Sequence, residues 1–297
     1  MPIFIRCYCD SSGRSPAWLG HQPPTIIKWS EYKEYLAKKY GNQYVSMQYS
    51  YAIKYIDCLE NPSKILEVPT SIKGNILKAL ICLSKYLGIY LEFKDALKQH
   101  GIKWTTATSF DSFINIFNNS HDSLLKWYRE ATNILNDNEK LYLKFMLLSG
   151  IRKNEGILSF NMIISLYKQN KLNEYFNEEL SALEHFKYKQ FLRISKNVYI
   201  SILPKELIIE IANSKPVSYN MIRKRLHKNN LKLRIKELRS YYATYLRKHG
   251  ILEEEVNLLQ GRIGKSIFVR HYLKENKQDF SNTILKIVKD LEQTINI

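Results

Sequence analysis

The sequence contains neither a candidate transmembrane helix nor a recognisable secretory signal peptide. Its 297 residues contain no uninterrupted apolar run approaching the roughly 20 residues that a membrane-spanning helix requires. The start, MPIFIRCYCDSS, has neither a basic region followed by a long apolar stretch nor a cleavage signature. We therefore expect an intracellular protein with no membrane partner.

Cysteines are also scarce. Four in this length exclude a disulfide-stapled scaffold. Cys58 and Cys82 fall within apolar helical patterns, where a buried thiol is typical. Cys7 and Cys9 with His21 make a poor metal site, because the cysteine spacing is shorter than usual and a fourth ligand is missing. The sequence predicts no metal site.

Acidic residues are too few to balance the basic ones. The chain has 28 Asp and Glu against 45 Lys and Arg, a formal net charge of +17, which favours a polyanionic partner. Hydrophobic residues make up 45% and aromatic residues 12%, enough to fill cores and to exclude wholesale disorder. The length suggests about two domains.

The first domain is predicted over residues 29–110, after an N-terminal arm at 1–28 that lacks any hydrophobic period. Apolar residues spaced three and four apart predict a helix from Trp29 that ends at Gly41. Ser46 is the expected N-cap of a second helix, which stops before Pro62. Two more helices are expected over 72–87 and 93–97. The whole predicts a small helical bundle.

The second domain is predicted over residues 111–297, beyond a polar linker at 105–109. It has a patterned helix over 124–135 and then LYLKFMLLSGIR, which predicts a buried helix stopped at Gly150. Alternation over 188–203 predicts a β-hairpin with its turn at 195–197, and helices follow Pro204. The expected fold class is mainly α with a small antiparallel hairpin, an α+β architecture.

Six residues of this domain form a set with one chemistry, although each is ordinary alone. In chain order they are Arg152, Lys196, Lys236, Arg239, Arg262 and Tyr272. Arginine forks bind phosphate oxygens bidentately and stay protonated. A tyrosine hydroxyl is a covalent nucleophile when cations favour its phenolate, and a lysine on a hairpin tip can protonate a leaving oxygen. The set suits metal-free transesterification of a DNA phosphodiester.

The same residues lie in segments that resemble the successive boxes of the tyrosine recombinases. The segments are SGIRKNE (149–155), ISKNVYISILP (194–204), KELRSYYATYLRKHG (236–250), EVNLLQGRIG (255–264) and VRHYL (269–273). They are most similar to those of archaeal virus integrases of the fusellovirus (SSV) type. The spacings from Arg239 to Arg262 and on to Tyr272, 23 and 10 residues, are close to the family's.

This resemblance implies that Arg152 and Arg239 are the two arginines of the site, Lys196 the hairpin lysine and Tyr272 the nucleophile. It also implies a helical core-binding domain, double-stranded attachment-site DNA as partner and a homotetramer on the synapse. Two positions depart from the commoner pattern: Lys236 stands where His is usual, and Arg262 where His or Trp is usual. Neither cation is a good base, so the group that deprotonates Tyr272 stays open.

A basic surface is expected beside this site. The stretch from 221 to 248 holds many cations against the single acid Glu237. The predicted DNA-binding residues are Arg223, Lys224, Arg225, Lys228, Lys232 and Arg234. The amphipathic C-terminal helix, from Ser281, has two possible roles: closing its own core, or docking on a neighbouring protomer.

The predicted function is a site-specific DNA recombinase that integrates or excises a viral or mobile element in the host cytoplasm through a 3′-phosphotyrosyl intermediate. No metal, ATP or nicotinamide cofactor is implied, because the phosphotyrosine conserves the bond energy and the cations neutralise the phosphate. Two alternatives remain: a type IB topoisomerase that relaxes DNA without a second duplex, and a non-catalytic DNA-binding regulator with the same fold.

Overall fold

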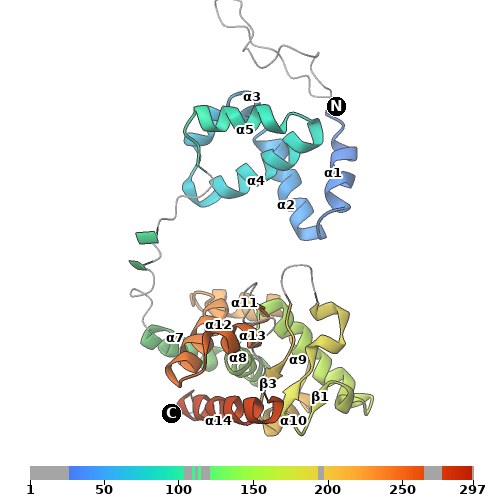
Figure 1. Ribbon diagram of the computed structural model, residues 1–297, viewed down its shortest axis with the longest axis vertical. Coiled ribbons are helices and arrows are strands. Elements are labelled where there is room, and N and C mark those ends of the chain that lie inside the picture. The colour runs from blue at the N-terminus through green and yellow to red at the C-terminus, as the bar shows by residue number, and fades with distance from the viewer. Residues whose placement is uncertain are drawn as a thin grey trace, which may run out of the picture. The chain divides into compact units, whose positions relative to one another are not determined.

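The structure is a computed structural model that describes residues 27–103, 109–110, 113–114, 121–192, 197–263 and 276–295. The chain divides into two compact units, residues 1–115 and 116–297, each with its own hydrophobic core. The described residues are mostly helical, with a small three-stranded antiparallel sheet in the second unit (Figure 1). This confirms the predicted fold class, mainly α with a small antiparallel β component.

The N-terminal unit is a helical bundle. Its elements are α1 (Trp29–Ala37), α2 (Asn42–Lys54), α3 (Asp57–Glu60), the 3₁₀ turn η1 (Pro62–Leu66), α4 (Thr70–Leu87) and α5 (Tyr90–Gln99). The helix expected over 72–87 is confirmed as α4, and its apolar residues Ile76, Leu80 and Leu83, spaced four and three apart, are fully buried. They pack in one core with Tyr32 and Leu36 of α1, so the helical period identified the buried face of each helix, and the structure shows which faces share a core.

The expected start of the second helix is wrong. Helix α2 begins at Asn42, with Gly41 as its N-cap in an extended conformation. Ser46 lies inside the helix, where its hydroxyl donates to the Asn42 carbonyl 3.1 Å away. A serine can satisfy its hydroxyl in this way within a helix, so it need not mark the first turn. The helix also ends earlier than expected, at Lys54, and α3 follows as a separate turn.

Eight helices surround the core of the described part of the C-terminal unit: α7 (His121–Ile134), α8 (Asp137–Ser149), α9 (Lys153–Lys168), α10 (Lys205–Ala212), α11 (Tyr219–Lys228), α12 (Ile235–Lys248), α13 (Glu253–Leu259) and α14 (Lys277–Ile295). Helix α8 is the predicted buried helix. An Asn136–Glu139 capping box begins it, and Gly150 ends it in the left-handed conformation. It packs against α7, α9, α10, α12 and α14.

The sheet consists of β1 (Phe176–Asn177), β2 (Ala182–Leu183) and β3 (Ser201–Ile202), antiparallel and in that order. The predicted β-hairpin is therefore partly wrong. Its outgoing arm contains β3, but β3 pairs with β2, whereas Lys189–Phe191 of the incoming arm form a 3₁₀ turn, η4. The buried Phe191 ring packs onto neighbouring aromatic rings, and this packing outweighs the alternating pattern. The expected turn residues 195 and 196 lie outside the described residues.

Helix α14 packs on its own unit. Ile284, Val288 and Leu291 are fully buried in the same core as α8 and α12, and the helix contacts β3. Of the two roles considered for this helix, the structure has the first, closure of its own core. In the parts of the chain that the structure describes, no helix is long and apolar enough to cross a membrane.

Candidate active site

Arg239 is the centre of the candidate site. Helix α12 buries this arginine to 9% exposure. One guanidinium nitrogen donates to the Gly150 carbonyl at 2.9 Å and another to the Gln260 carbonyl at 2.8 Å. Gln260 returns a hydrogen bond from its side-chain amide to the Arg239 carbonyl at 3.1 Å. The guanidinium therefore joins the end of α8 to the end of α13.

Each of these two carbonyls lies two residues before another predicted arginine. The turn after α8 runs from Gly150 to Arg152, which is the N-cap of α9. The turn after α13 runs through Gly261, at φ +66°, to Arg262. Three separate segments thus meet at the Arg239 guanidinium, and two of them continue into further arginines. The structure brings together three of the six predicted catalytic residues.

The positive charges of Arg152 and Arg262 affect the pKa of Arg239. Burial, together with the positive charges of Arg152 and Arg262, lowers the pKa of its guanidinium to about 9. Like charges held together in a partly buried place are unfavourable unless an anion compensates them. The arrangement is therefore suited to an anion with several oxygens, such as a phosphate.

Arg152 connects this cluster to the segment that follows the predicted hairpin turn. Its Nη1 donates to the Asn197 carbonyl at 3.2 Å and lies 3.9 Å from an oxygen of the buried Glu155 carboxylate. The Asn197 carbonyl also packs on Gly261, where an added Cβ would lie only 1.9 Å from that oxygen. Residue 197 is therefore in contact with the Arg152 side chain and with the turn that precedes Arg262.

The other predicted catalytic residues are placed differently or lie outside the described parts. Lys236 stands on the first turn of α12 and is exposed, although Arg239 three residues later is buried. Lys196 and Tyr272 lie outside the described residues. Their proposed roles remain predictions.

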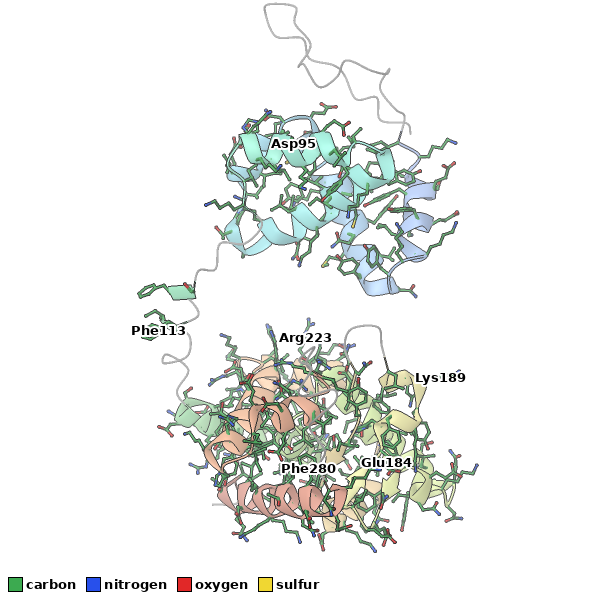
Figure 2. The ribbon with its side chains drawn as sticks, viewed as in Figure 1. Asp95, Phe113, Glu184, Lys189, Arg223 and Phe280 are labelled. Carbon is green, nitrogen blue, oxygen red and sulfur yellow. The ribbon has the colours of Figure 1, made fainter. Side chains whose placement is uncertain are left out.

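The predicted DNA-binding cations divide into two groups. Arg223, Lys224, Lys228 and Lys232 are exposed; Figure 2 shows the Arg223 side chain at the surface of α11. Arg225 and Arg234 are engaged within the protein. The first lies 2.7 Å from the buried Glu139 carboxylate of the α8 capping box. The second bonds the carboxylate of Glu237 and both the hydroxyl and the carbonyl of Ser123 on α7.

The sequence offered little sign of several residues that shape the site. Gly150, Gln260 and Asn197 contribute backbone carbonyls to arginines, and any residue type has such a carbonyl. The glycine beside Arg262 was visible in the GRIG segment. The sequence did not show that Gly261 approaches Asn197 closely, because the two residues are more than 60 positions apart.

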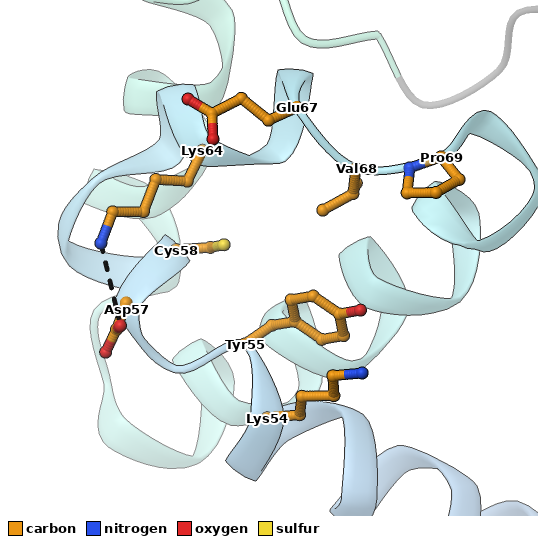
Figure 3. Close-up of a pocket in the computed structure, with 8 residues that line it drawn as sticks. All are labelled: Lys54, Tyr55, Asp57, Cys58, Lys64, Glu67, Val68 and Pro69. Carbon is orange, nitrogen blue, oxygen red and sulfur yellow. Dashed lines mark ion pairs between the residues drawn. The ribbon is translucent and has the colours of Figure 1, made fainter.

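The N-terminal unit contains a pocket of a different character. It encloses about 320 Å³ and is lined by residues that include Lys54, Asp57, Lys64 and Glu67. Figure 3 shows the Cys58 thiol pointing into it, beside the Lys64–Asp57 ion pair. Burial raises the pKa of that thiol, so it is a weak nucleophile. Cations and carboxylates are present in equal number in the lining, whereas the cluster around Arg239 holds three arginines, and we assign the pocket no catalytic role.

Comparison with known proteins agrees with this chemistry. Residues 117–283 match the model of a family described as archaeal phage integrase. No match is found among curated proteins or among solved structures. The matched range is more than half of the chain and includes the arginine cluster. The chain belongs to the archaeal phage integrase family.

Proposed function

We propose that this integrase is a tyrosine recombinase, of the kind found in fuselloviruses. Tyr272 attacks the scissile phosphate of an attachment site, its oxygen bonds to phosphorus, and the bond from phosphorus to the 5′-oxygen breaks. The 3′-phosphotyrosyl link keeps the bond energy. The 5′-hydroxyl of a partner duplex then attacks the link, rejoins the DNA and releases Tyr272.

The arginine cluster is the observation on which this proposal rests. A pentavalent phosphorane has its charge on non-bridging oxygens, and preorganised cations stabilise it without a metal. Arg239 is held by two carbonyls, so its guanidinium is oriented before DNA binds. Its charge is added to those of Arg152 and Arg262, which act on its pKa. We propose that these three arginines bind the scissile phosphate.

The two lysines have separate roles in this proposal. Lys196 directly precedes Asn197, whose carbonyl accepts a hydrogen bond from Arg152, and we assign it the proton that the leaving 5′-oxygen takes up. Lys236 is exposed on the first turn of α12, one turn before Arg239, and supplies further positive charge. Neither lysine is a base when protonated, so the acceptor of the Tyr272 proton is water, the phosphate or a deprotonated Lys236.

The rest of the charge serves to bind DNA. The exposed cations Arg223, Lys224, Lys228 and Lys232 contact the phosphate backbone with little sequence preference. The helical bundle at 29–110 is the core-binding domain in this proposal, so that it and the domain at 111–297 bind one duplex together. Recombination then takes place in a homotetramer that holds two duplexes in a synapse.

Covalent capture tests the proposal. Nicked duplexes with a randomised central sequence are incubated with the full chain, and adducts that survive detergent are sequenced to define the site. Wild-type protein should form an adduct, whereas Tyr272→Phe should form none while still binding DNA. Tyr167→Phe removes an exposed phenol on α9 and should leave the yield unchanged. Binding by wild type without any adduct would refute the mechanism.

The alternatives predict other results. A type IB topoisomerase would relax supercoiled plasmid that lacks the selected site, efficiently and without a second duplex. A DNA-binding regulator would give no adduct, and Tyr272→Phe would change nothing. A recombinase should instead join the cleaved strand to a second duplex that contains the selected site.

A further inference from the structure

A buried network of polar side chains includes Ser201 and contacts Phe191, two described residues on either side of Lys196 in the sequence. The Tyr175 hydroxyl donates to the Ser159 hydroxyl at 2.9 Å and lies 2.7 Å from Nδ1 of His185. The other ring nitrogen of His185, Nε2, lies 2.8 Å from the Ser201 hydroxyl. All four residues are buried. The network links α9, through Ser159, to β3, through Ser201.

Burial determines the charge of His185 in this network, and the hydrogen bonds determine which of its ring nitrogens carries the proton. Burial lowers the pKa of His185 to about 3, so the imidazole is neutral under working conditions. Because Tyr175 donates to Ser159, the Nδ1–H of His185 must donate to the phenol oxygen. Nε2 then accepts the proton of the Ser201 hydroxyl. Each ring nitrogen has a partner, so rotation of the ring would break two buried hydrogen bonds.

The network involves residues on both sides of the segment 192–197, since it contacts Phe191 before the segment and includes Ser201 after it. The Phe191 ring lies 4.7 Å from the His185 ring and stacks on Tyr175, centroid to centroid at 6.1 Å. The Val198 amide donates to the Phe191 carbonyl at 3.1 Å and so closes the segment at its base. Ser201 holds the outgoing arm three residues later. Apolar packing thus positions one arm and a directional hydrogen bond the other.

The geometry points to a positioning role for this network in the proposed reaction. We infer that the Ser159–Tyr175–His185–Ser201 network fixes the backbone on either side of residues 193–196, at Phe191 and at Ser201, and that Lys196 depends on this support to reach the leaving 5′-oxygen. The inference rests on the proposed function. The buried His185 does not touch DNA, so it is a positioning residue. Helix α9 contributes Ser159 to the network. The N-cap of the same helix is Arg152, whose side chain donates to the Asn197 carbonyl.

A polar network suits such a task better than apolar packing alone. Hydrogen bonds have defined directions, and a buried donor without a partner costs about 1–3 kcal/mol, so one arrangement is strongly preferred. Misplacement of a catalytic group by about 1 Å can lower a rate about 10²-fold. A small distortion of the network should therefore appear first in the step that needs the Lys196 proton.

Tyr175→Phe tests this inference, since it removes one oxygen and keeps the ring. Two substrates with the selected site are compared, one with the natural 5′-bridging oxygen and one with sulfur there. When the bond to phosphorus breaks, oxygen needs a proton, whereas sulfur leaves as a thiolate because thiols are far more acidic than alcohols. We expect Tyr175→Phe to cleave the oxygen substrate about 10- to 100-fold more slowly than wild type and to cleave the sulfur substrate at nearly the wild-type rate.

Three further variants make the comparison decisive. Lys196→Ala should show the same rescue by sulfur, with a larger loss on oxygen. Ser201→Ala removes only the bond to Nε2 and serves if Tyr175→Phe fails to fold. Tyr128→Phe removes a buried phenol on α7, in a different part of the unit, and should leave both substrates unaffected.

The outcomes separate the inference from the proposed function. Equal losses on both substrates for Tyr175→Phe and Ser201→Ala, or no loss on oxygen for either, would overturn the positioning role. If Lys196→Ala were not rescued by sulfur, the proton donor would be misassigned and the inference would fall with it. Absence of any wild-type adduct on either substrate would instead refute the recombinase mechanism itself.

Discussion

The close approach between Gly261 and Asn197 leads to a specific prediction. Gly261→Ala places a Cβ 1.9 Å from the Asn197 carbonyl oxygen and 2.6 Å from its carbon. Ordinary contacts begin near 3.4 Å, so the two backbone segments must separate by about 1.5 Å. Gly261 directly precedes Arg262, and Asn197 directly follows Lys196. The substitution should therefore disturb two parts of the proposed site at once.

A second glycine provides the matched control. Gly250 also has a left-handed backbone, at φ +86°, but an added Cβ there meets nothing within 4 Å. Gly250→Ala should lower the free energy of unfolding by about 1 kcal/mol, the conformational cost for alanine in that region. Gly261→Ala should add about 1–3 kcal/mol of overpacking to the same cost. The difference between the two variants isolates the close approach.

Two assays measure the effect. Chemical denaturation gives the free energy of unfolding of each variant, and covalent capture on the selected duplex gives the cleavage rate. A displacement of about 1.5 Å should slow cleavage by Gly261→Ala at least about 10²-fold. DNA binding should persist, because the exposed cations of α11 are distant in the sequence and unchanged. If Gly261→Ala matched Gly250→Ala in both stability and cleavage, the contact between these segments would be irrelevant to the site.

Other substitutions test the remaining parts of the argument. Lys228→Ala should weaken DNA binding and lower the salt slope by about one unit, as measured by titration at several salt concentrations. Arg225→Ala should instead lower the free energy of unfolding, because it leaves the buried Glu139 without its cation. Arg239→Met should abolish covalent capture while binding is largely kept, and normal cleavage at saturation would contradict the proposed site. His185 has a pKa of about 3 when folded and near 6.5 when unfolded, so the unfolded chain binds more protons between these values. The free energy of unfolding should therefore fall as pH drops below 6.5, by roughly 3 kcal/mol at pH 4, and His185→Phe should lack this dependence in denaturation at each pH.

The sequence alone determined the features that depend on local periodicity and composition. The buried helix α8, its stop at Gly150 and the stripe of α4 follow from apolar spacing and from the one residue that readily takes a left-handed conformation. The net charge of +17 indicated a polyanion, and the chemistry of six residues of three types, Arg, Lys and Tyr, indicated phosphate. The helix predictions needed only neighbours in the chain, and the charge and the six-residue set needed only the residue types and their order.

Tertiary structure decided what depends on residues far apart in the sequence. Strand β3 pairs with β2 and not with the predicted incoming arm at 188–192, because Phe191 of that arm is buried among aromatic rings of other elements. Arg225 and Arg234 were predicted to bind DNA, and the structure shows that they also bond within the protein, to Glu139 of α8 and Ser123 of α7. Arg239 is oriented by two backbone carbonyls. Every residue has such a carbonyl, so the sequence could not identify these two. The sequence identified the cations, whereas packing decided which of them meet at one point.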